Sequence, residues 1–238
     1  MPARVIWVAD DGTGDFTTVQ AALDSITDAT ATKPYLIRIA PGVYETATRI
    51  TTKDHVDIEG SGQDITIIRC TSCSTAQNED VRIAAVDLSS RTEIRQLTID
   101  NTKQPVGSWV AAVYASGNDE KSLLNVTLTT APNVFSYGVL NDRTGSTMTA
   151  TNVSVPVKAA WKNLGGDSTS PLILDSQLGI LDSGSSVVGG SSRIVGSELR
   201  SEVSDRRGDR HNCIGSYSFV SENLRWIELP GSCRRPPR

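Results

Sequence analysis

Three residues in the second half of the sequence carry side chains that a polysaccharide lyase would need. Asp142 and Asp175 are carboxylates that could bind a calcium ion, and Lys158 is a base that could remove a proton from a sugar ring. Such a site forms only where a fold brings distant segments onto one surface. The alternative interpretation is that both aspartates end turns, where Asp is favoured by local hydrogen bonds. Both interpretations depend on the elements that hold these residues.

The composition argues against several other classes of function. The chain has 238 residues and a formal net charge of −4, so no overall positive field would attract nucleic acid. It contains no run of about 18 apolar residues, and we expect no membrane span. His55 and His211 form no metal-ligand motif, and no GxSxG motif accompanies them. We expect no cofactor, with calcium needed only for a lyase.

The four cysteines permit three disulfide pairings. Cys70 and Cys73 form a CxxC motif after a strand-like run, and no second CxxC completes a zinc site. We interpret this pair as a local disulfide or as two half-buried thiols. Cys213 and Cys233 flank the last strand-like segment and could close it with a bridge that contributes about 2–4 kcal/mol. The even number fits an exported protein, so we expect a secreted or cell-surface location, although no signal peptide opens the sequence.

One short amphipathic helix is predicted near the N-terminus. Thr17 and Gln20 form a capping box, and Phe16 can pack on Ala21 as a hydrophobic staple. Apolar residues then follow at helical spacing, which predicts a helix over 17–26. These apolar residues are Val19, Ala22, Leu23 and Ile26. Strand-like runs lie on either side, at 5–8 and 36–39.

From about residue 56 a ragged repeat of strand-like segments begins. Seven six-residue segments share one pattern, and the period of roughly 20–30 residues is typical of one coil of a solenoid. The third position is polar or Gly and predicts a corner of the coil. The fifth is polar and is expected to face water, whereas the sixth is aliphatic and is expected to stack inside the solenoid. The segments start at residues 62, 94, 123, 150, 173, 194 and 219.

These patterns predict an all-β protein, a right-handed parallel β-helix with a short N-terminal capping α-helix. A single domain is expected over 1–233, with coils over 56–233 and a disordered tail over 234–238. The helix at 17–26 would cover the exposed edge of the first coil. A β-sandwich is the alternative fold.

Three runs in the first third of the chain resemble a known family in their order and spacing. The first two are DDGTGDFTTVQAALDSI at 10–26 and IAPGVY at 39–44, and the third is VDIEGSGQDITII at 56–68. Together they resemble the N-terminal third of pectin methylesterases, which are secreted right-handed parallel β-helix enzymes. Beyond about residue 70, the sequence resembles only the wider pectin-lyase-like superfamily.

The resemblance implies an ester-hydrolysing site whose motifs are missing from this sequence. In the family, an aspartate nucleophile works with a second aspartate, an arginine and glutamines, in runs such as QAVAL, YQDTLY, DFIFG and GRPW. None of these runs follows the opening motifs, and the expected place of the glutamine run reads WVAAV at 109–113.

We therefore predict a non-catalytic exported scaffold or a glycan-contacting protein. Polysaccharide is the candidate partner, and we expect a monomer. The alternative is a polysaccharide-active enzyme, of esterase or lyase type, with a relocated acidic site. That site would be the grouping of Asp142, Asp175 and Lys158.

Overall fold

The computed structural model describes most of the chain up to residue 155 and the backbones of short strands beyond it. The described residues are 4–74, 82–103, 109–116, 119–131, 136–141 and 147–155, followed by ten strands between residues 159 and 234.

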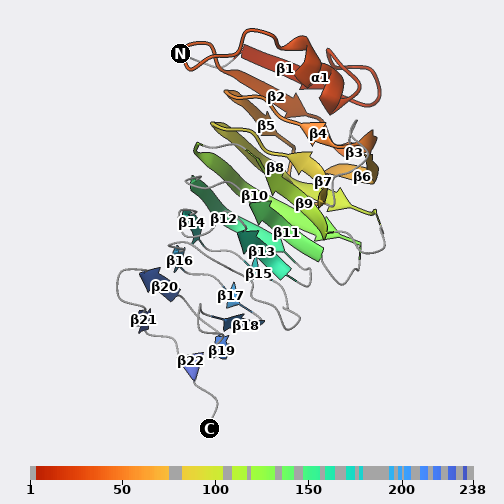
Figure 1. Cartoon of the computed structure of the whole chain (residues 1–238). Helices are drawn as coiled ribbons and strands as arrows, with labels where there is room; N and C mark the ends of the chain where they lie inside the picture. The colour runs from red at the N-terminus through yellow and green to blue at the C-terminus, as the bar shows by residue number, and fades with distance from the viewer. Residues whose placement is uncertain are drawn as a thin grey trace.

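The described part of the chain forms a mostly β structure, a parallel β-solenoid of about five turns with one short helix (Figure 1). The predicted parallel β-helix with a short N-terminal helix is thereby confirmed. Its backbone pairs mainly within one long sheet of 14 described strands. The strands of the long sheet's main path are β1 (Arg4–Val8), β2 (Tyr35–Ile39), β5 (Val56–Glu59), β8 (Thr92–Asn101), β10 (Lys121–Thr130), β12 (Thr147–Val155), β14 (Ser170–Leu174), β16 (Arg193–Val195), β20 (Tyr217–Val220) and β21 (Arg225–Glu228). Its side branches are β3 (Gly42–Thr48), β6 (Thr66–Ser74), β15 (Gln177–Leu178) and β17 (Glu198–Leu199).

Two smaller sheets complete the described strands. A five-stranded parallel sheet forms another side of the solenoid, and a three-stranded antiparallel sheet lies near the C-terminus. The five-stranded sheet consists of β4 (Ile50–Thr51), β7 (Arg82–Asp87), β9 (Trp109–Ala115), β11 (Ser136–Asn141) and β13 (Ala159–Asn163). The three-stranded sheet consists of β18 (Ser201–Ser204), β19 (Arg210–Cys213) and β22 (Cys233–Arg234).

The core is a column of aliphatic side chains inside the coils. The parallel register aligns one inward residue per strand from β2 to β10, and each of these side chains is fully buried. Burying one such side chain contributes about 1.5–3 kcal/mol, so repetition of one inward position accounts for much of the stability. The column is Ile37, Ile58, Ile94 and Leu123.

The predicted helix forms, but its cap lies one residue later than expected. Helix α1 spans Val19–Ser25, and the extended Thr18 is its N-cap, because the Oγ1 of Thr18 accepts a hydrogen bond from the Ala21 N–H at 3.2 Å. Gln20 does not complete a capping box. Its Nε2 donates to Asp24 at 2.8 Å, and its Oε1 accepts from the Thr51 N–H at 3.2 Å. Gln20 therefore ties the helix to β4.

The prediction that the third position of the repeat turns a corner is confirmed in each of the four coils described there. Asp64, Gln96, Asn125 and Asn152 all have left-handed backbones, with φ between 50° and 62°. Asn, Asp and similar polar residues tolerate this conformation better than most residues, because their side chains can hydrogen-bond locally. In addition, the Nδ2 of Asn152 donates to the Oδ1 of Asn125 at 2.7 Å, which links two successive corners.

The prediction for the sixth position is confirmed in three described coils and wrong in the first. Ile99, Leu128 and Val155 are buried, whereas Ile67 is only half-buried. Ile68 aligns with Ile99 instead, because the first coil has one more residue between its corner and its inward position.

The expectation that the fifth position faces water is wrong for Thr66 and Thr98, which are buried. The Oγ1 of Thr66 accepts from the Ser61 N–H at 2.9 Å and donates to the carbonyl of Ala40 at 3.1 Å. The Oγ1 of Thr98 accepts from the Asp64 N–H at 3.2 Å. A threonine hydroxyl can thus be buried here because the neighbouring corner supplies its partners.

The ladder begins earlier than residue 56 and changes character near its end. β1, β2 and β5 already pair in parallel, so the strand-like runs beside the helix belong to the solenoid. In contrast, β16 pairs with β20, and β20 with β21, in antiparallel fashion. Of the predicted tail, Arg234 belongs to β22, and residues 235–238 lie outside the described residues.

The outer edge of β1 is covered by the segment that precedes the helix. The Trp7 N–H donates to the Asp15 carboxylate at 2.9 Å, and the Trp7 carbonyl accepts from the N–H groups of Asp15 and Phe16. The Ala9 N–H then donates to the Phe16 carbonyl at 3.0 Å. The outer edge is therefore closed along Trp7 to Ala9 by residues 15 and 16, and helix α1 contacts β1, β2 and β4.

Candidate functional site

The predicted lyase grouping falls where the structure gives no description. Asp142, Lys158 and Asp175 lie outside the described residues, so this grouping stays a prediction.

The structure joins two of the four cysteines. Cys70 and Cys73 form a disulfide, with their Cα atoms 5.5 Å apart. Cys213 and Cys233 are directly opposite each other in the antiparallel pair of β19 and β22. The side chains of this second pair lie outside the described residues, and their bridge stays a prediction.

Residues 109–113, where the family resemblance predicts a glutamine run, lie on β9, in the middle of the five-stranded sheet. This sheet carries a second hydrophobic cluster, which is separate from the main core of the solenoid. Ala111 lies between Ala84 and Tyr137 in register, and the Trp109 ring meets the Tyr137 ring edge-on at 6.3 Å. Tyr114 belongs to the same cluster. Apolar packing thus occupies the place where the family pattern has amide side chains, in agreement with the absence of glutamine from residues 109–113.

One carboxylate lies beside this cluster, and neighbouring side chains hold it in place. Asp87 is in register with Tyr114, and its Oδ2 is 3.8 Å from the Nη1 of Arg49. The Ser116 hydroxyl donates to the other carboxylate oxygen, and the Arg49 guanidinium lies 5.5 Å from the centre of the Tyr114 ring. Asp87 is the only Asp or Glu within the five described strands of this sheet.

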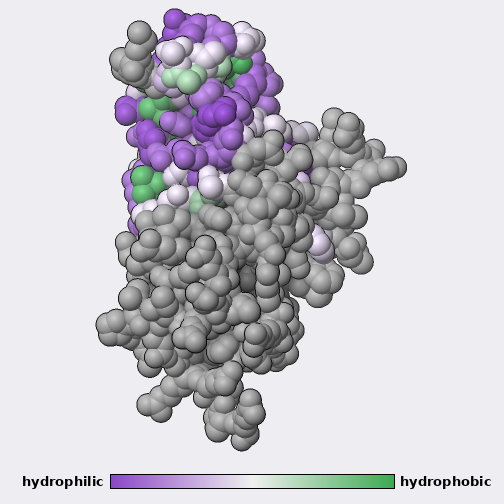
Figure 2. Space-filling model, turned by 60° about the vertical axis from the view of Figure 1, so that its left-hand side comes forward, coloured by the Kyte–Doolittle hydropathy of each residue, from purple (hydrophilic) through white to green (hydrophobic). Residues whose placement is uncertain are grey.

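A groove of about 590 Å³ lies instead on the long sheet, where β5, β8, β10 and β12 begin. Three carboxylates and two cationic side chains line it, together with hydroxyl groups and one methionine. The surface around this part of the molecule is largely hydrophilic, with small separate hydrophobic areas (Figure 2). The lining residues are Asp57, Arg91, Thr92, Glu93, Glu120, Lys121, Ser122, Thr147, Met148 and Thr149.

Two carboxylates in this groove come from neighbouring strands. The Oδ1 of Asp57 accepts a hydrogen bond from the Glu93 N–H at 2.9 Å. Burial raises the pKa of Asp57, and the negative charge of Glu93 adds to the rise, while the Glu93 N–H and the positive charge of Arg95 oppose it. Asp57 therefore keeps its proton to a higher pH than an ordinary aspartate.

Arg95 fixes the second carboxylate and extends the polar surface. Its Nη1 is 2.6 Å from Glu93, and its Nη2 is 2.7 Å from Glu59. Glu59 in turn lies 3.7 Å from the Nη2 of Arg38 on β2. Ion pairs thus run across three strands and hold these long side chains in defined positions.

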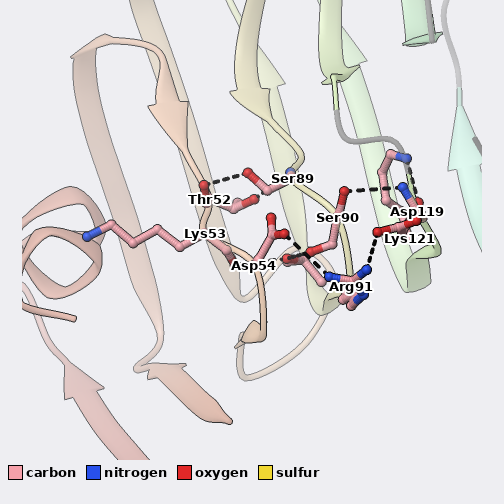
Figure 3. Close-up of polar contacts among 9 residues, drawn as sticks. Thr52, Lys53, Asp54, Ser89, Ser90, Arg91, Asp119 and Lys121 are labelled. Atoms are coloured by element: carbon pink, nitrogen blue, oxygen red, sulfur yellow. Dashed lines mark hydrogen bonds and ion pairs between the residues drawn. The ribbon is translucent and has the colours of Figure 1, made fainter. Parts of the chain in front are cut away.

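At one end of the groove, Arg91 links the corners of three coils (Figure 3). Its Nη2 donates to the Asp119 carboxylate, and its Nη1 lies 3.8 Å from Asp54. The Asp119 N–H also donates to the Ser90 hydroxyl at 3.2 Å. All three charged side chains are about half exposed, so each of these ion pairs contributes little stability, about 0–1 kcal/mol.

Lys121 is the buried cation of this region. It is 3% exposed, and its Nζ donates to the Asp119 carbonyl at 2.8 Å. Burial lowers the pKa of Lys121 to about 8, although the charges of Asp119 and Asp54 oppose that shift. The amine therefore loses its proton in mildly alkaline solution, far below the usual range for lysine.

Sequence reasoning missed this groove, although a local signal existed. Asp57 and Glu59 alternate with buried residues in β5, and Glu93 and Arg95 do the same in β8. Charged residues two positions apart in a strand share one face. Loops of different lengths between coils hid the alignment of these two pairs.

Two further observations concern the described residues. Within the described ranges, no three His, Cys, Asp or Glu side chains gather so as to hold a metal ion. No helix in that same part of the chain is long and apolar enough to cross a membrane.

Comparison with known proteins gives a family match and a set of similar folds. The family model described as Pectinesterase matches residues 5–132, which is more than half of the chain. None of the curated proteins matches the sequence.

Three of the similar solved structures are pectin methylesterases. The carrot enzyme is 18% identical with a TM-score of 0.52, and the match covers 73% of this chain and 62% of that one. The Aspergillus niger enzyme is 15% identical with a TM-score of 0.55, and the match covers 88% of this chain and 64% of that one. The Yersinia enterocolitica enzyme is 16% identical with a TM-score of 0.54, and the match covers 82% of this chain and 85% of that one. This chain therefore spans less than two thirds of the carrot and Aspergillus enzymes, and at these identities the likeness is one of fold.

Proposed function

Because the chain belongs to the pectinesterase family, we propose that it is a glycan-contacting solenoid that does not hydrolyse methyl esters. The observation that carries this proposal is which residues make up the described strands of the five-stranded sheet. Its five described strands contain one carboxylate, Asp87, and the place of the glutamine run is packed with alanine and aromatic side chains.

Ester hydrolysis with an aspartate nucleophile needs more than one held carboxylate. A second acid must exchange a proton with the leaving group, and donors must stabilise the oxyanion. Asp87 lies beside Arg49 and Ser116. The five described strands of the five-stranded sheet contain no second aspartate or glutamate that could act as the acid. This composition supports a loss of the family's reaction.

The groove on the long sheet supports contact with a glycan. Sugar hydroxyl groups are recognised by hydrogen-bonding side chains that are already held in position, since fewer rotamers are then lost on binding. Glu93, Glu59 and Arg95 are held in this way by their mutual ion pairs. The serine and threonine hydroxyls of the groove lining add further donors and acceptors.

The test measures reaction and binding on the same preparation. The protein is incubated with highly methyl-esterified pectin, and released methanol is measured beside a buffer blank and a pectin methylesterase as positive control. We expect methanol at the level of the blank and retardation of the protein in a native gel containing the pectin. Methanol release that the Asp87→Asn variant abolishes would overturn the proposal.

A second assay addresses the lyase alternative. Polygalacturonate and alginate are incubated with and without calcium, and unsaturated products are followed by absorbance. We expect no increase in absorbance. Calcium-dependent product that disappears in a folded Asp175→Ala variant would replace this proposal with the lyase interpretation.

A further inference from the structure

A row of outward-facing side chains runs from the first strand of the solenoid toward the groove. The parallel register places Trp7 beside Arg38, Arg38 beside Glu59, and Glu59 beside Arg95. Neighbouring strands are about 4.8 Å apart, so the row is roughly 14 Å long. Arg95 joins it to the groove through its ion pair with Glu93. A linear ligand lying across the strands would therefore contact the row and the groove together.

Trp7 forms the far end of this row and is 49% exposed. Its backbone is fixed by hydrogen bonds to Asp15 and Phe16, and the Arg38 guanidinium lies 5.6 Å from the centre of its ring. The indole ring of Trp7 is therefore exposed in a fixed position. A large indole with an apolar face is suited to stacking on the carbon–hydrogen face of a sugar ring.

The charges along the row and groove decide which sugars fit. Six carboxylates and four cationic side chains surround this surface, which leaves an excess of negative charge. The arginines already face carboxylates of the protein, and Lys121 donates to a backbone carbonyl. The acids are Asp54, Asp57, Glu59, Glu93, Asp119 and Glu120, and the cations are Arg38, Arg91, Arg95 and Lys121.

A polyuronate would bring one further carboxylate with each sugar. Like charges placed together at an interface disfavour binding strongly, and here the protein's cations are engaged by its own acids. An uncharged chain meets no such repulsion, and its hydroxyls can use the remaining lone pairs of the carboxylates.

We propose that the groove and the row ending at Trp7 form a binding track for an uncharged polysaccharide, and that this track rejects chains with free carboxylates. The track lies on the long sheet, whereas residues 109–113, the expected place of the family's glutamine run, lie on the five-stranded sheet. The inference rests on the proposed glycan contact. It adds that the ligand is uncharged, that it lies across the strands, and that one of its sugars stacks on Trp7.

The experiment compares two chains that share one backbone. Highly methyl-esterified pectin and the same preparation after alkaline de-esterification are titrated against the protein at low ionic strength, where charge effects are least screened. Affinity electrophoresis gives both dissociation constants. We expect binding of the esterified chain and binding at least about tenfold weaker for the de-esterified chain.

Variants test the stacking and the repulsion separately. Trp7→Ala should weaken binding of the esterified chain about 5- to 10-fold, and Trp7→Phe should restore most of it. Ile65→Ala is the matched control, because Ile65 is 52% exposed but lies outside the row. The double variant Asp57→Asn with Glu93→Gln should strengthen binding of the de-esterified chain, since it removes two charges and keeps polar groups.

The outcomes separate this inference from the proposed function. If both chains bind equally well, or if folded Trp7→Ala binds as the unmodified protein does, the track is refuted while glycan contact stands. If neither chain binds, both proposals fail. Melting temperatures of the variants show whether a loss of binding comes from a loss of folding.

Discussion

Replacing Lys121 by methionine should stabilise the protein at neutral pH. Burial lowers the pKa of this lysine from 10.5 to about 8, so the folded protein holds the charged amine less favourably than the unfolded chain does. At 1.36 kcal/mol per pKa unit, the shift corresponds to roughly 3 kcal/mol. Solvent screening near the half-exposed Asp54 and Asp119 reduces this value, and we expect a gain of about 1–2 kcal/mol in the free energy of unfolding.

The same substitution should change how stability depends on pH. Below pH 8 the lysine is charged in both the folded and the unfolded state, and the folded protein carries the full free-energy cost of burying the charge. Between about pH 8 and 10.5 the folded state has lost the proton while the unfolded chain still binds it, so the stability of the unmodified protein rises with pH. Above pH 10.5 the amine is neutral in both states, so no charge is buried and this cost disappears. Lys121→Met has no such group, and its advantage should therefore shrink across the window.

Methionine suits this position because its neighbours form part of the core. Lys121 aligns with Thr92 on one side and with Met148 on the other, and both are buried. A flexible thioether can fill the space of the lysine stem. Urea unfolding followed by circular dichroism at pH 6, 8 and 10 gives the free energies.

A second variant separates the charge from the packing. Lys121→Arg keeps a positive charge throughout this range, so its stability relative to Lys121→Met should not change with pH. If the difference between the unmodified protein and Lys121→Met were constant from pH 6 to pH 10, the reasoning from the cost of a buried charge would be refuted.

Three further substitutions test the corners, the packing and the surface pairs. Asn125→Ala should cost about 1–2 kcal/mol in urea unfolding, because alanine is strained at φ 54° and loses the amide link between corners, and Asn125→Gly should cost less. Gly60→Ala should cost about 2–3 kcal/mol by the same measurement, since its Cβ would lie 2.4 Å from the carbonyl oxygen of Gln96. Asp119→Asn should cost less than about 1 kcal/mol despite its contact with Arg91, and repeating the unfolding at high salt should remove most of that difference.

The corners and the core column could be predicted from the sequence because each depends on local chemistry. A left-handed corner favours residues such as Asn125 and Asn152, and an aliphatic residue three positions later must then point inward. The prediction failed at Ile67, where one additional residue follows the corner. Such an offset leaves no local mark, because Ile67 and Ile68 are both apolar.

The groove could not be predicted, because it depends on which strands become neighbours. Asp57 and Glu93 are 36 residues apart, and their contact follows from the register between β5 and β8. The same limit applies to the cap of α1. Thr17 and Thr18 have the same capping chemistry, and the choice between them depends on how Asp15 and Phe16 are held against β1.

The closed edge of β1 also bears on how copies of this protein could associate. Parallel solenoids can grow end to end when the first strand of one molecule adds to the last strand of another. Along Trp7 to Ala9, the groups that would template such an addition are already bonded to Asp15 and Phe16. An incoming strand would have to displace these internal partners. Fibre growth by strand addition is thereby blocked along this part of the N-terminal end.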